Sequence, residues 1–279
     1  MTGFPIQRSQ GQMLREFEEQ GFVVIPNALD SDQIAISNRA IDDDLSTNLH
    51  DWVRFDETLI ETVDVISRTE KFDFTIENPI TLGFLRSLLG EETSFEEFEV
   101  IIREPTVKPR DIKGWHRDMI RDYNRRMEIQ YVSVIYYLTD VSERDHCFSI
   151  IPGTHNRLVD LKPEDVVTGC EFDVMGPAGT AILFHGRCIH TGKLKPQSRQ
   201  RRTLHIYYWR ANRPRTSEWT EIPKRLYEKS EPSLPPLLYS KWNMMEVIEG
   251  VGKKPRDVDP AMSVADMLRE VQRRANRIV

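Results

Sequence analysis

The sequence predicts an α+β protein in which helices come first and a β-sandwich or β-barrel core follows. Before residue 95, apolar residues recur mainly with helical spacing. From Phe95 onward, short runs rich in Val, Ile, Tyr and Phe alternate with turns that contain Pro and Gly. Helices followed by many short strands are typical of an α+β fold. With 279 residues, 39% of them hydrophobic, the chain is long enough to bury a sizeable core.

The part before residue 95 is expected to contain one strand and three helices, namely strand 22–25 and helices 12–20, 33–44 and 79–89. Gly21 and Gly90 are suited to end the first and the last of these helices. Ser31-Asp32 can cap the second helix, because a side-chain oxygen there satisfies free backbone N–H groups.

The core is expected to consist of five strands over residues 97–103, 129–138, 148–151, 180–184 and 203–209. After residue 210, Pro214, Pro223 and the segment 230–236 predict an irregular tail over the surface. A final amphipathic helix is expected over 263–277. We see no second domain boundary and expect a single domain over 1–279, divided into a helical flank, a core and a C-terminal extension (12–94, 95–210 and 211–279).

Composition excludes several classes of function. The chain has 38 Lys and Arg against 44 Asp and Glu, a net charge of −6, whereas a general nucleic-acid binder needs a basic face. No apolar run approaches the roughly 18 residues of a membrane span, and the first residues lack the apolar core of a signal peptide. The three cysteines, Cys147, Cys170 and Cys188, lie far apart and form no CxxC pair. We therefore expect a cytoplasmic protein with reduced thiols and with no nucleic-acid or membrane partner.

Three residues are candidate metal ligands: His116, Asp118 and His190. Residues i and i+2 of an extended segment point the same way, so His116 and Asp118 can offer an imidazole and a carboxylate to one ion. His190 follows the predicted strand 180–184 and can supply a third ligand from elsewhere in the fold. Two histidines and one carboxylate leave coordination positions open, as in non-haem Fe(II) oxygenases. The spacing alone is a weak signal, because a chain with seven histidines matches it often by chance.

The order of motifs around these residues resembles the phytanoyl-CoA dioxygenase family of Fe(II)/2-oxoglutarate-dependent oxygenases. The matching motifs are residues 17–26, 115–118, 137–140, 150–155, 179–190 and 201–204, so the resemblance spans about residues 12 to 210. It implies a double-stranded β-helix core (jelly-roll, cupin-like) with flanking N-terminal helices. It also implies that His116, Asp118 and His190 bind the iron.

The resemblance further implies that an arginine eleven residues after the second histidine binds the C5 carboxylate of 2-oxoglutarate, which selects Arg201. A guanidinium suits this task, because its planar fork grips a carboxylate with two hydrogen bonds and stays charged. Arg202 is the alternative, and we favour Arg201, because neighbours on a strand face opposite sides. Many members carry Ser two residues after that histidine, where this chain has Gly192. The missing hydroxyl could come from Thr191, Ser198 or Thr203.

The implied activity is that of a dioxygenase that uses Fe(II), 2-oxoglutarate and O2 to hydroxylate an aliphatic C–H of a small molecule, with release of succinate and CO2. Asp118 counts against halogenation, since halogenases of this type replace the carboxylate by a small residue. A catalytically silent jelly-roll binding protein, and a cupin-like metal enzyme that does not use 2-oxoglutarate, are the alternatives; the complete ligand set and Arg201 count against them. We expect a monomer or a homodimer.

Clues to the substrate are few. Arg117 and Arg121 follow the first metal ligand and could guide an anionic molecule, although charged runs usually face solvent. Tyr131 could line the cavity, and His205 shares a strand face with Arg201. We expect His185 to have a structural role, although it stands only five residues before His190.

Overall fold

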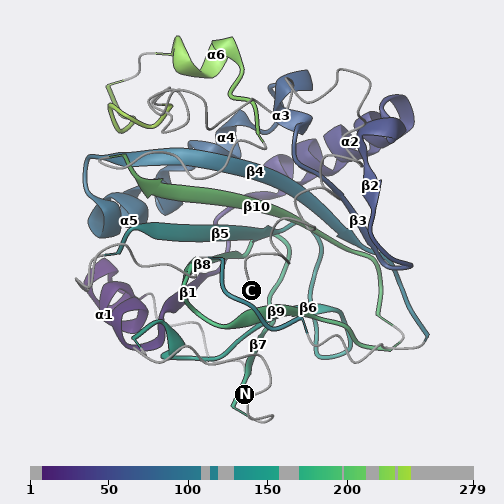
Figure 1. The fold of residues 1–279 in the computed structure, drawn as a ribbon, viewed down its shortest axis with the longest axis horizontal. Coiled ribbons are helices and arrows are strands. Elements are labelled where there is room, and N and C mark those ends of the chain that lie inside the picture. The colour runs from purple at the N-terminus through teal and green to yellow at the C-terminus, as the bar shows by residue number, and fades with distance from the viewer. Residues whose placement is uncertain are drawn as a thin grey trace, which may run out of the picture.

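The computed structural model describes residues 8–107, 114–118, 129–156, 170–196, 198–211, 220–229 and 232–239. Within these residues, ten strands form two antiparallel sheets (Figure 1). The large sheet has the order β1-β8-β5-β10-β4-β3-β2, and the small sheet has the order β7-β6-β9. The strands are β1 Phe22–Ile25, β2 Val53–Arg54, β3 Leu59–Thr62, β4 Thr93–Arg103, β5 Tyr131–Tyr137, β6 Cys147–Ile150, β7 Phe172–Val174, β8 Ala181–His185, β9 His190–Lys193 and β10 Arg201–Arg210.

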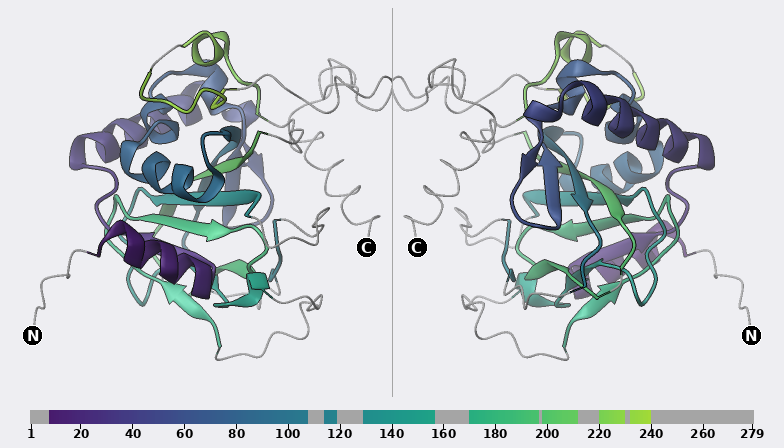
Figure 2. Two further views of the ribbon diagram at one scale, coloured as in Figure 1. Left: turned by 90° about the vertical axis from the view of Figure 1, so that its left-hand side faces the viewer. Right: turned by 90° about the vertical axis from the view of Figure 1, so that its right-hand side faces the viewer.

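The helices gather on one side of the large sheet, as the two side views of Figure 2 show. They are α1 Gln10–Gln20, α2 Ser31–Thr47, α3 Val65–Arg68, α4 Asp73–Ile76, α5 Pro79–Leu89 and α6 Lys224–Tyr227, with short 3₁₀ helices η1 Leu49–Asp51 and η2 Thr154–Asn156. Helix α5 packs against β4, β5 and β10, and α1 packs against β1 and α5.

Strand β10 shows how the sequence separates the two faces of the large sheet. Leu204, Ile206 and Tyr208 are fully buried and belong to the core beneath the helices. The alternate residues of β10, such as Thr203 and His205, face the small sheet and line a cavity. This alternation follows from the period of two along a strand. Two facing sheets of this kind form the double-stranded β-helix that the sequence predicted.

The helix ends follow elementary capping chemistry. Gly21 ends α1 with a φ of 81°, a left-handed conformation that suits glycine. Helix α2 is capped by Asp30, whose carboxylate accepts the N–H of Gln33. The prediction of Ser31-Asp32 as the cap was therefore wrong by one position, because the helix already begins at Ser31. Helix α5 occupies the predicted range, Pro79–Leu89, and Gly90 follows it.

The part before residue 95 is less purely helical than predicted. Besides the predicted strand β1, it supplies β2 and β3, which were not predicted; β3 pairs with β4 and extends the large sheet. Strands β7 and β9 of the small sheet were not predicted either. Strand β4 begins at Thr93, four residues before the predicted start. These short strands form because a neighbouring strand offers its free backbone groups.

Part of the C-terminal extension packs against the body of the protein instead of forming only an irregular tail. Leu226, Leu238 and Tyr239 are buried, and the N–H of Phe95 donates to the carbonyl oxygen of Leu238 at 2.7 Å. The predicted helix over 263–277 lies outside the described residues.

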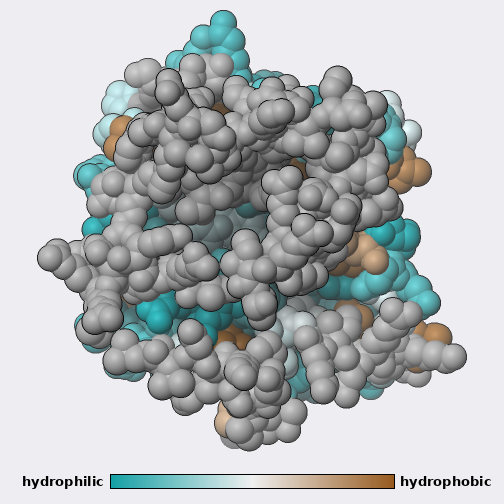
Figure 3. Space-filling model, in the orientation of Figure 1, coloured by the Kyte–Doolittle hydropathy of each residue, from teal (hydrophilic) through white to brown (hydrophobic). Residues whose placement is uncertain are grey.

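The described surface carries few large hydrophobic side chains. On the face in Figure 3 they lie as separate spots among hydrophilic residues. The exposed ones are Leu49, Ile80, Val107, Phe172, Met175 and Leu237. None of the described helices is both long and apolar enough to span a membrane.

Candidate metal centre and cosubstrate cavity

His116 and His190 are brought together by their own backbones. The N–H of each residue donates to the carbonyl oxygen of the other at 3.0 Å, which forms an isolated antiparallel bridge. His190 is also the first residue of β9, where it pairs with Ile150 of β6. The segment 114–118 is therefore attached to the edge of the small sheet, and the rings of His116 and His190 lie with their centroids 4.3 Å apart.

The three predicted ligands converge. His190 Nε2 lies 3.2 Å from Asp118 Oδ1, and His116 Nε2 lies 3.7 Å from the same oxygen. One ligand atom from each residue lies within 4.8 Å of the others. His190 is buried, whereas the side chain of His116 is 58% exposed. Two imidazoles and a carboxylate this close can all reach one transition-metal ion.

Hydrogen bonds to the backbone prepare both histidines for a metal. His116 Nδ1 lies 2.7 Å from the carbonyl oxygen of Gly114, and His190 Nδ1 lies 3.0 Å from that of Cys188. A carbonyl oxygen can only accept, so each Nδ1 carries the proton. In the neutral ring, Nε2 then keeps its lone pair for a metal. Metal-binding histidines usually donate their second N–H in this way.

Asp118 is held as a carboxylate. Ser133 Oγ, on β5, donates to Asp118 Oδ2 at 2.8 Å. Although burial opposes it, the neighbouring His190, His116 and Ser133 lower the pKa of Asp118 to about 2. The charge needed for metal binding is therefore present throughout the neutral range.

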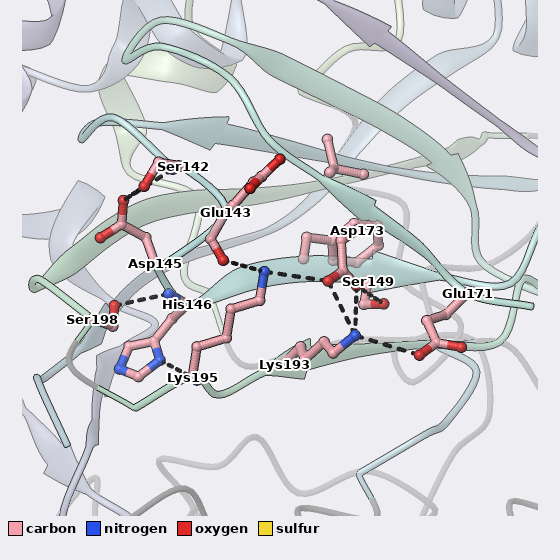
Figure 4. A network of polar contacts seen from close by, with 12 residues as sticks. Ser142, Glu143, Asp145, His146, Ser149, Glu171, Asp173, Lys193, Lys195 and Ser198 are labelled. Atoms are coloured by element: carbon pink, nitrogen blue, oxygen red, sulfur yellow. Dashed lines mark hydrogen bonds and ion pairs between the residues drawn. The ribbon is translucent and has the colours of Figure 1, made fainter. Parts of the chain in front are cut away.

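A polar network on the outer face of the small sheet supports the strand that carries His190 (Figure 4). Lys193 Nζ, on β9, lies 3.0 Å from Asp173 Oδ2 on β7. Ser149 Oγ, on β6, donates to Asp173 Oδ1 at 2.8 Å, and Lys195 Nζ lies 3.2 Å from Asp173 Oδ2. One carboxylate thus ties all three strands of the small sheet together.

A cavity of about 570 Å³ lies between the two sheets, and the metal triad forms part of its wall. Arg201 also lines this cavity and is only 5% exposed. Its Nε and Nη1 have no hydrogen-bond partner among the described residues. Burial lowers the pKa of Arg201, but a guanidinium remains protonated in proteins. A buried cation with free N–H groups is a ready site for a carboxylate.

Gly192 lies between the metal triad and Arg201 in the cavity wall. Gly192 stands two residues after His190 on β9, which is about 7 Å along a strand. A Cβ atom on Gly192 would lie 3.8 Å from Arg201 Nη2. The triad and Arg201 therefore border the same cavity, with no side chain from Gly192 to fill the space beside the guanidinium.

The orientation of β10 agrees with the preference for Arg201 over Arg202. Arg201 lines the cavity, whereas Arg202 lies on the helix side, where its Nη2 is 2.7 Å from Asp42 Oδ1 of α2. Thr203 and His205 also line the cavity.

Two of the three hydroxyls considered for the cosubstrate do not lie in the cavity wall. Thr191 was predicted as a contact, but it pairs with Ser149 on the outer face of the small sheet, because His190 and Gly192 take the inner positions. Ser198 Oγ is bound to the N–H of His146 and the carbonyl oxygen of Arg199. Only Thr203 keeps a place in the wall.

The predicted substrate residues were His205, Arg117, Tyr131 and Arg121, and of these His205 faces the cavity. The Nε of Arg117 donates to the carbonyl oxygen of Arg187 at 2.8 Å, and Arg117 is not part of the cavity wall. Tyr131 is buried against Tyr207 with ring centroids 5.9 Å apart, and it does not line the cavity either. Arg121 lies outside the described residues.

His185 has the structural surroundings that we expected. Its ring lies 6.4 Å from that of Phe17 and 5.4 Å from that of His155, centroid to centroid, beside α1. Burial and the neighbouring His155 lower the pKa of His185 to about 3. It is not among the residues that line the cavity.

Four charged residues of the cavity wall were not among the predicted site residues: Asp56, Glu61, Glu99 and Arg103. Burial raises the pKa of Glu61 to about 7, and burial together with Glu61 and Glu97 raises that of Glu99 well above its usual range. Tyr207 donates its O–H to Glu99 Oε2 at 3.0 Å. The available signal was the period of two in β4, which places Glu99 and Arg103 on one strand face.

A double-stranded β-helix with two histidines and an aspartate at its metal site defines a class, the non-haem iron oxygenases. The description of the matching family model is Phytanoyl-CoA dioxygenase (PhyH), and it covers residues 17–203. The chain belongs to this family, as the motif order predicted. It is a 2-oxoglutarate-dependent non-haem iron oxygenase, with iron as cofactor and 2-oxoglutarate as cosubstrate. The silent binding protein and the metal enzyme without 2-oxoglutarate are thereby set aside.

Several solved structures share the fold. The non-heme alpha ketoglutarate dependent carbocyclase SnoK from nogalamycin biosynthesis is 18% identical, with a TM-score of 0.62 over 82% of this chain and 95% of that chain. The epimerase SnoN in complex with Fe3+, alpha ketoglutarate and nogalamycin RO is 16% identical, with a TM-score of 0.60 over 80% and 92%. HygX from Streptomyces hygroscopicus, with nickel and 2-oxoglutarate bound, is 18% identical, with a TM-score of 0.58 over 71% and 85%. No curated protein sequence matches the chain.

Proposed function

We propose that His116, Asp118 and His190 bind Fe(II), that Arg201 binds the distal carboxylate of 2-oxoglutarate, and that the enzyme hydroxylates an aliphatic C–H of a small molecule. One observation carries this proposal. A single cavity is lined by a His-Asp-His triad and by a buried guanidinium, that of Arg201, whose Nε and Nη1 have no hydrogen-bond partner among the described residues. When bound, the iron centre with 2-oxoglutarate and O2 supplies the oxidant. The overall reaction converts R–H, 2-oxoglutarate and O2 into R–OH, succinate and CO2.

The residues of the chain position the reactants. The proton on each histidine Nδ1 fixes both rings, and Ser133 fixes the carboxylate of Asp118. Phe148 and Phe184, which flank the ring of His190 at 5.3 and 4.6 Å between centroids, keep water from that side of the site. These contacts support a metal site of fixed shape in which the reacting C–H and the metal are held close.

The charges in the cavity wall support a choice of substrate. The idea of an anionic substrate depended on arginines after His116, and Arg117 is engaged away from the cavity. Glu61 and Glu99 line the cavity on β3 and β4 instead. A positively charged group placed against these carboxyls would favour their ionised form and be attracted to it, and a neutral group can hydrogen-bond to them, whereas an anionic group would raise their pKa values further and gain no such attraction. We therefore propose that the substrate presents a neutral or positively charged group to this wall.

Uncoupled turnover tests the site assignment without knowledge of the substrate. Anaerobically loaded Fe(II) enzyme is exposed to O2 with 2-oxoglutarate, and succinate is measured. We expect slow succinate formation that His190→Ala and Arg201→Met abolish and that His185→Ala and Arg202→Met retain. Equal loss in all four variants, or retention in the first two, would contradict the assignment.

The substrate proposal has its own test, which uses small amines, alcohols and carboxylic acids of similar size as probes. We expect amines or alcohols to increase succinate formation more than the acids, and Glu99→Gln to reduce the response to amines. A stronger response to acids would overturn the proposed charge preference.

A further inference from the structure

Arg103, the last residue of β4, is a second arginine in the cavity wall besides Arg201. It lies directly opposite Arg201 in the antiparallel pairing of β4 with β10, so both side chains occupy the same sheet face. Like charges at opposite positions of neighbouring strands destabilise a sheet. An anion that contacts both guanidinium groups would remove this repulsion.

Arg103 is held on one side and free on another. Its Nη1 donates to Thr58 Oγ1 at 3.1 Å and lies 3.6 Å from Asp56 Oδ2. These contacts orient the side chain, which is 12% exposed, and together with Glu61 they compensate part of its charge. Its Nε has no partner among the described residues. Arg103 is therefore pre-positioned with donor capacity left over.

The two guanidinium groups converge beside Gly192. A Cβ atom at this position would lie 3.8 Å from Arg103 Nη2 and 3.8 Å from Arg201 Nη2. The two nitrogens are thus no more than twice that distance apart, and glycine leaves the space between them and β9 open. Many family members have a serine hydroxyl at this position.

None of the hydroxyls considered as its replacement is placed to act as one. Thr191 faces outward, and Ser198 is bound to the backbone. Thr203 Oγ1 lies 3.1 Å from His205 Nε2 and 3.4 Å from the carbonyl oxygen of Ile101. The donor nearest to Gly192 besides Arg201 is Arg103.

We propose that Arg103 is the second arm of a two-arginine clamp that holds the distal carboxylate of 2-oxoglutarate beside Gly192. This assignment rests on the proposed function, in which Arg201 is the first arm. It names a cosubstrate-binding residue on β4, outside the motifs that predicted the site, and it offers a replacement for the serine hydroxyl. The charge-assisted bonds of two guanidinium groups replace those of one guanidinium and one hydroxyl.

The test compares two keto acids that differ only at the distal end. 2-Oxoglutarate and 2-oxopentanoate, which lacks the distal carboxylate, are titrated anaerobically into the Fe(II)-loaded enzyme, and their dissociation constants are measured by calorimetry. For Arg103→Met, we expect binding of 2-oxoglutarate to weaken about 10- to 100-fold, as the loss of a charge-assisted hydrogen bond predicts. Binding of 2-oxopentanoate should change less than about twofold, because it never reaches the clamp. Arg103→Lys, which keeps the positive charge, should restore part of the preference and serves as the test variant if Arg103→Met does not fold.

The outcomes separate this inference from the proposed function. If wild type and Arg202→Met prefer 2-oxoglutarate, and Arg201→Met loses that preference while both Arg103 variants keep it, the two-arginine clamp is refuted and the proposed function stands. If Arg103→Met weakens both keto acids equally, Arg103 only shapes the cavity and the clamp is again refuted. If wild type itself shows no preference for 2-oxoglutarate, the proposed function fails together with the clamp.

Discussion

Replacing Arg201 by Met should have opposite effects on stability and on cosubstrate binding. Arg201 is buried, two of its nitrogens lack partners among the described residues, and Arg103 stands directly opposite. Each unsatisfied buried donor costs about 1–3 kcal/mol. Met keeps the apolar stem but removes the charge and the donors. We expect Arg201→Met to stabilise the metal-free protein by about 2 kcal/mol, which raises Tm by about 3–4 °C for a chain of this size.

The same change should remove most of the affinity for 2-oxoglutarate. Two charge-assisted hydrogen bonds contribute about 3–6 kcal/mol together, which corresponds to about a 10²- to 10⁴-fold weaker complex. Wild type with metal and 2-oxoglutarate at about 100 times its dissociation constant should gain about 2.7 kcal/mol, whereas Arg201→Met should gain almost none from the keto acid. The order of stability should therefore reverse when 2-oxoglutarate is added.

Thermal unfolding with and without 2-oxoglutarate, in the presence of metal and absence of O2, measures both effects. Arg202→Met is the matched control on the opposite face of β10, where it loses the ion pair with Asp42. It should lower Tm slightly and leave the shift caused by 2-oxoglutarate unchanged. The reasoning would be refuted if Arg201→Met were less stable than wild type and if 2-oxoglutarate raised its Tm as much as it raises that of wild type.

Three further predictions concern the stability of the fold and are checked by urea unfolding. Burial opposes the charged form of Asp44, but hydrogen bonds from Arg68 and its neighbours hold the pKa of Asp44 below its usual range. Asp44→Asn should therefore lower the free energy of unfolding by about 3 kcal/mol at pH 7. The difference in the free energy of unfolding between wild type and Asp44→Asn should shrink as the pH falls through the lowered pKa of Asp44, because wild type then loses the carboxylate charge. A difference that does not depend on pH would contradict this prediction. In the folded state His185 has a pKa of about 3 and stays neutral, whereas in the unfolded chain it is protonated below its ordinary pKa of 6.5. The free energy of unfolding should therefore fall as the pH decreases from 6.5 toward 3, by up to about 1.4 kcal/mol per pH unit. His185→Phe should flatten that slope, and an unchanged slope would exclude His185 as its source. Gly21→Ala should destabilise by at least about 2 kcal/mol, since φ is 81° and the new Cβ would lie 2.3 Å from Cys188 Sγ; wild-type stability would contradict this.

The sequence was most informative where a local pattern coincides with the tertiary role of a residue. The run Pro79–Leu89 is apolar, begins after a capping Asn78 and ends before a glycine, and it forms the predicted helix. The alternation along β10 separated Arg201 from Arg202 correctly in orientation, because the strand is central in the sheet and keeps a regular register from Arg201 to Tyr207. His116, Asp118 and His190 could be named as candidates because the order of motifs around them resembles that of the family, and the structure brings the three side chains together.

Features that depend on pairing between distant segments were not predictable. Strand β9, His190–Lys193, contains a glycine and a lysine and has little intrinsic strand propensity; it forms because β6 and the backbone of His116 bind its edge. Arg103 and Glu61 resemble solvent-facing charges in the sequence. Only the register that places Arg103 opposite Arg201, and Leu59 beside Arg103, brings these charges into the cavity.

The most direct test of the central claim is an anaerobic titration of the metal-free protein with Fe(II) and then 2-oxoglutarate, followed by visible absorption. We predict that the weak charge-transfer band of the iron chelate appears in wild type and in His185→Ala. The band should be lost in His190→Ala, and in Arg201→Met it should require far more 2-oxoglutarate. Iron binding without the band in wild type, or a band that survives in His190→Ala but not in His185→Ala, would contradict the account.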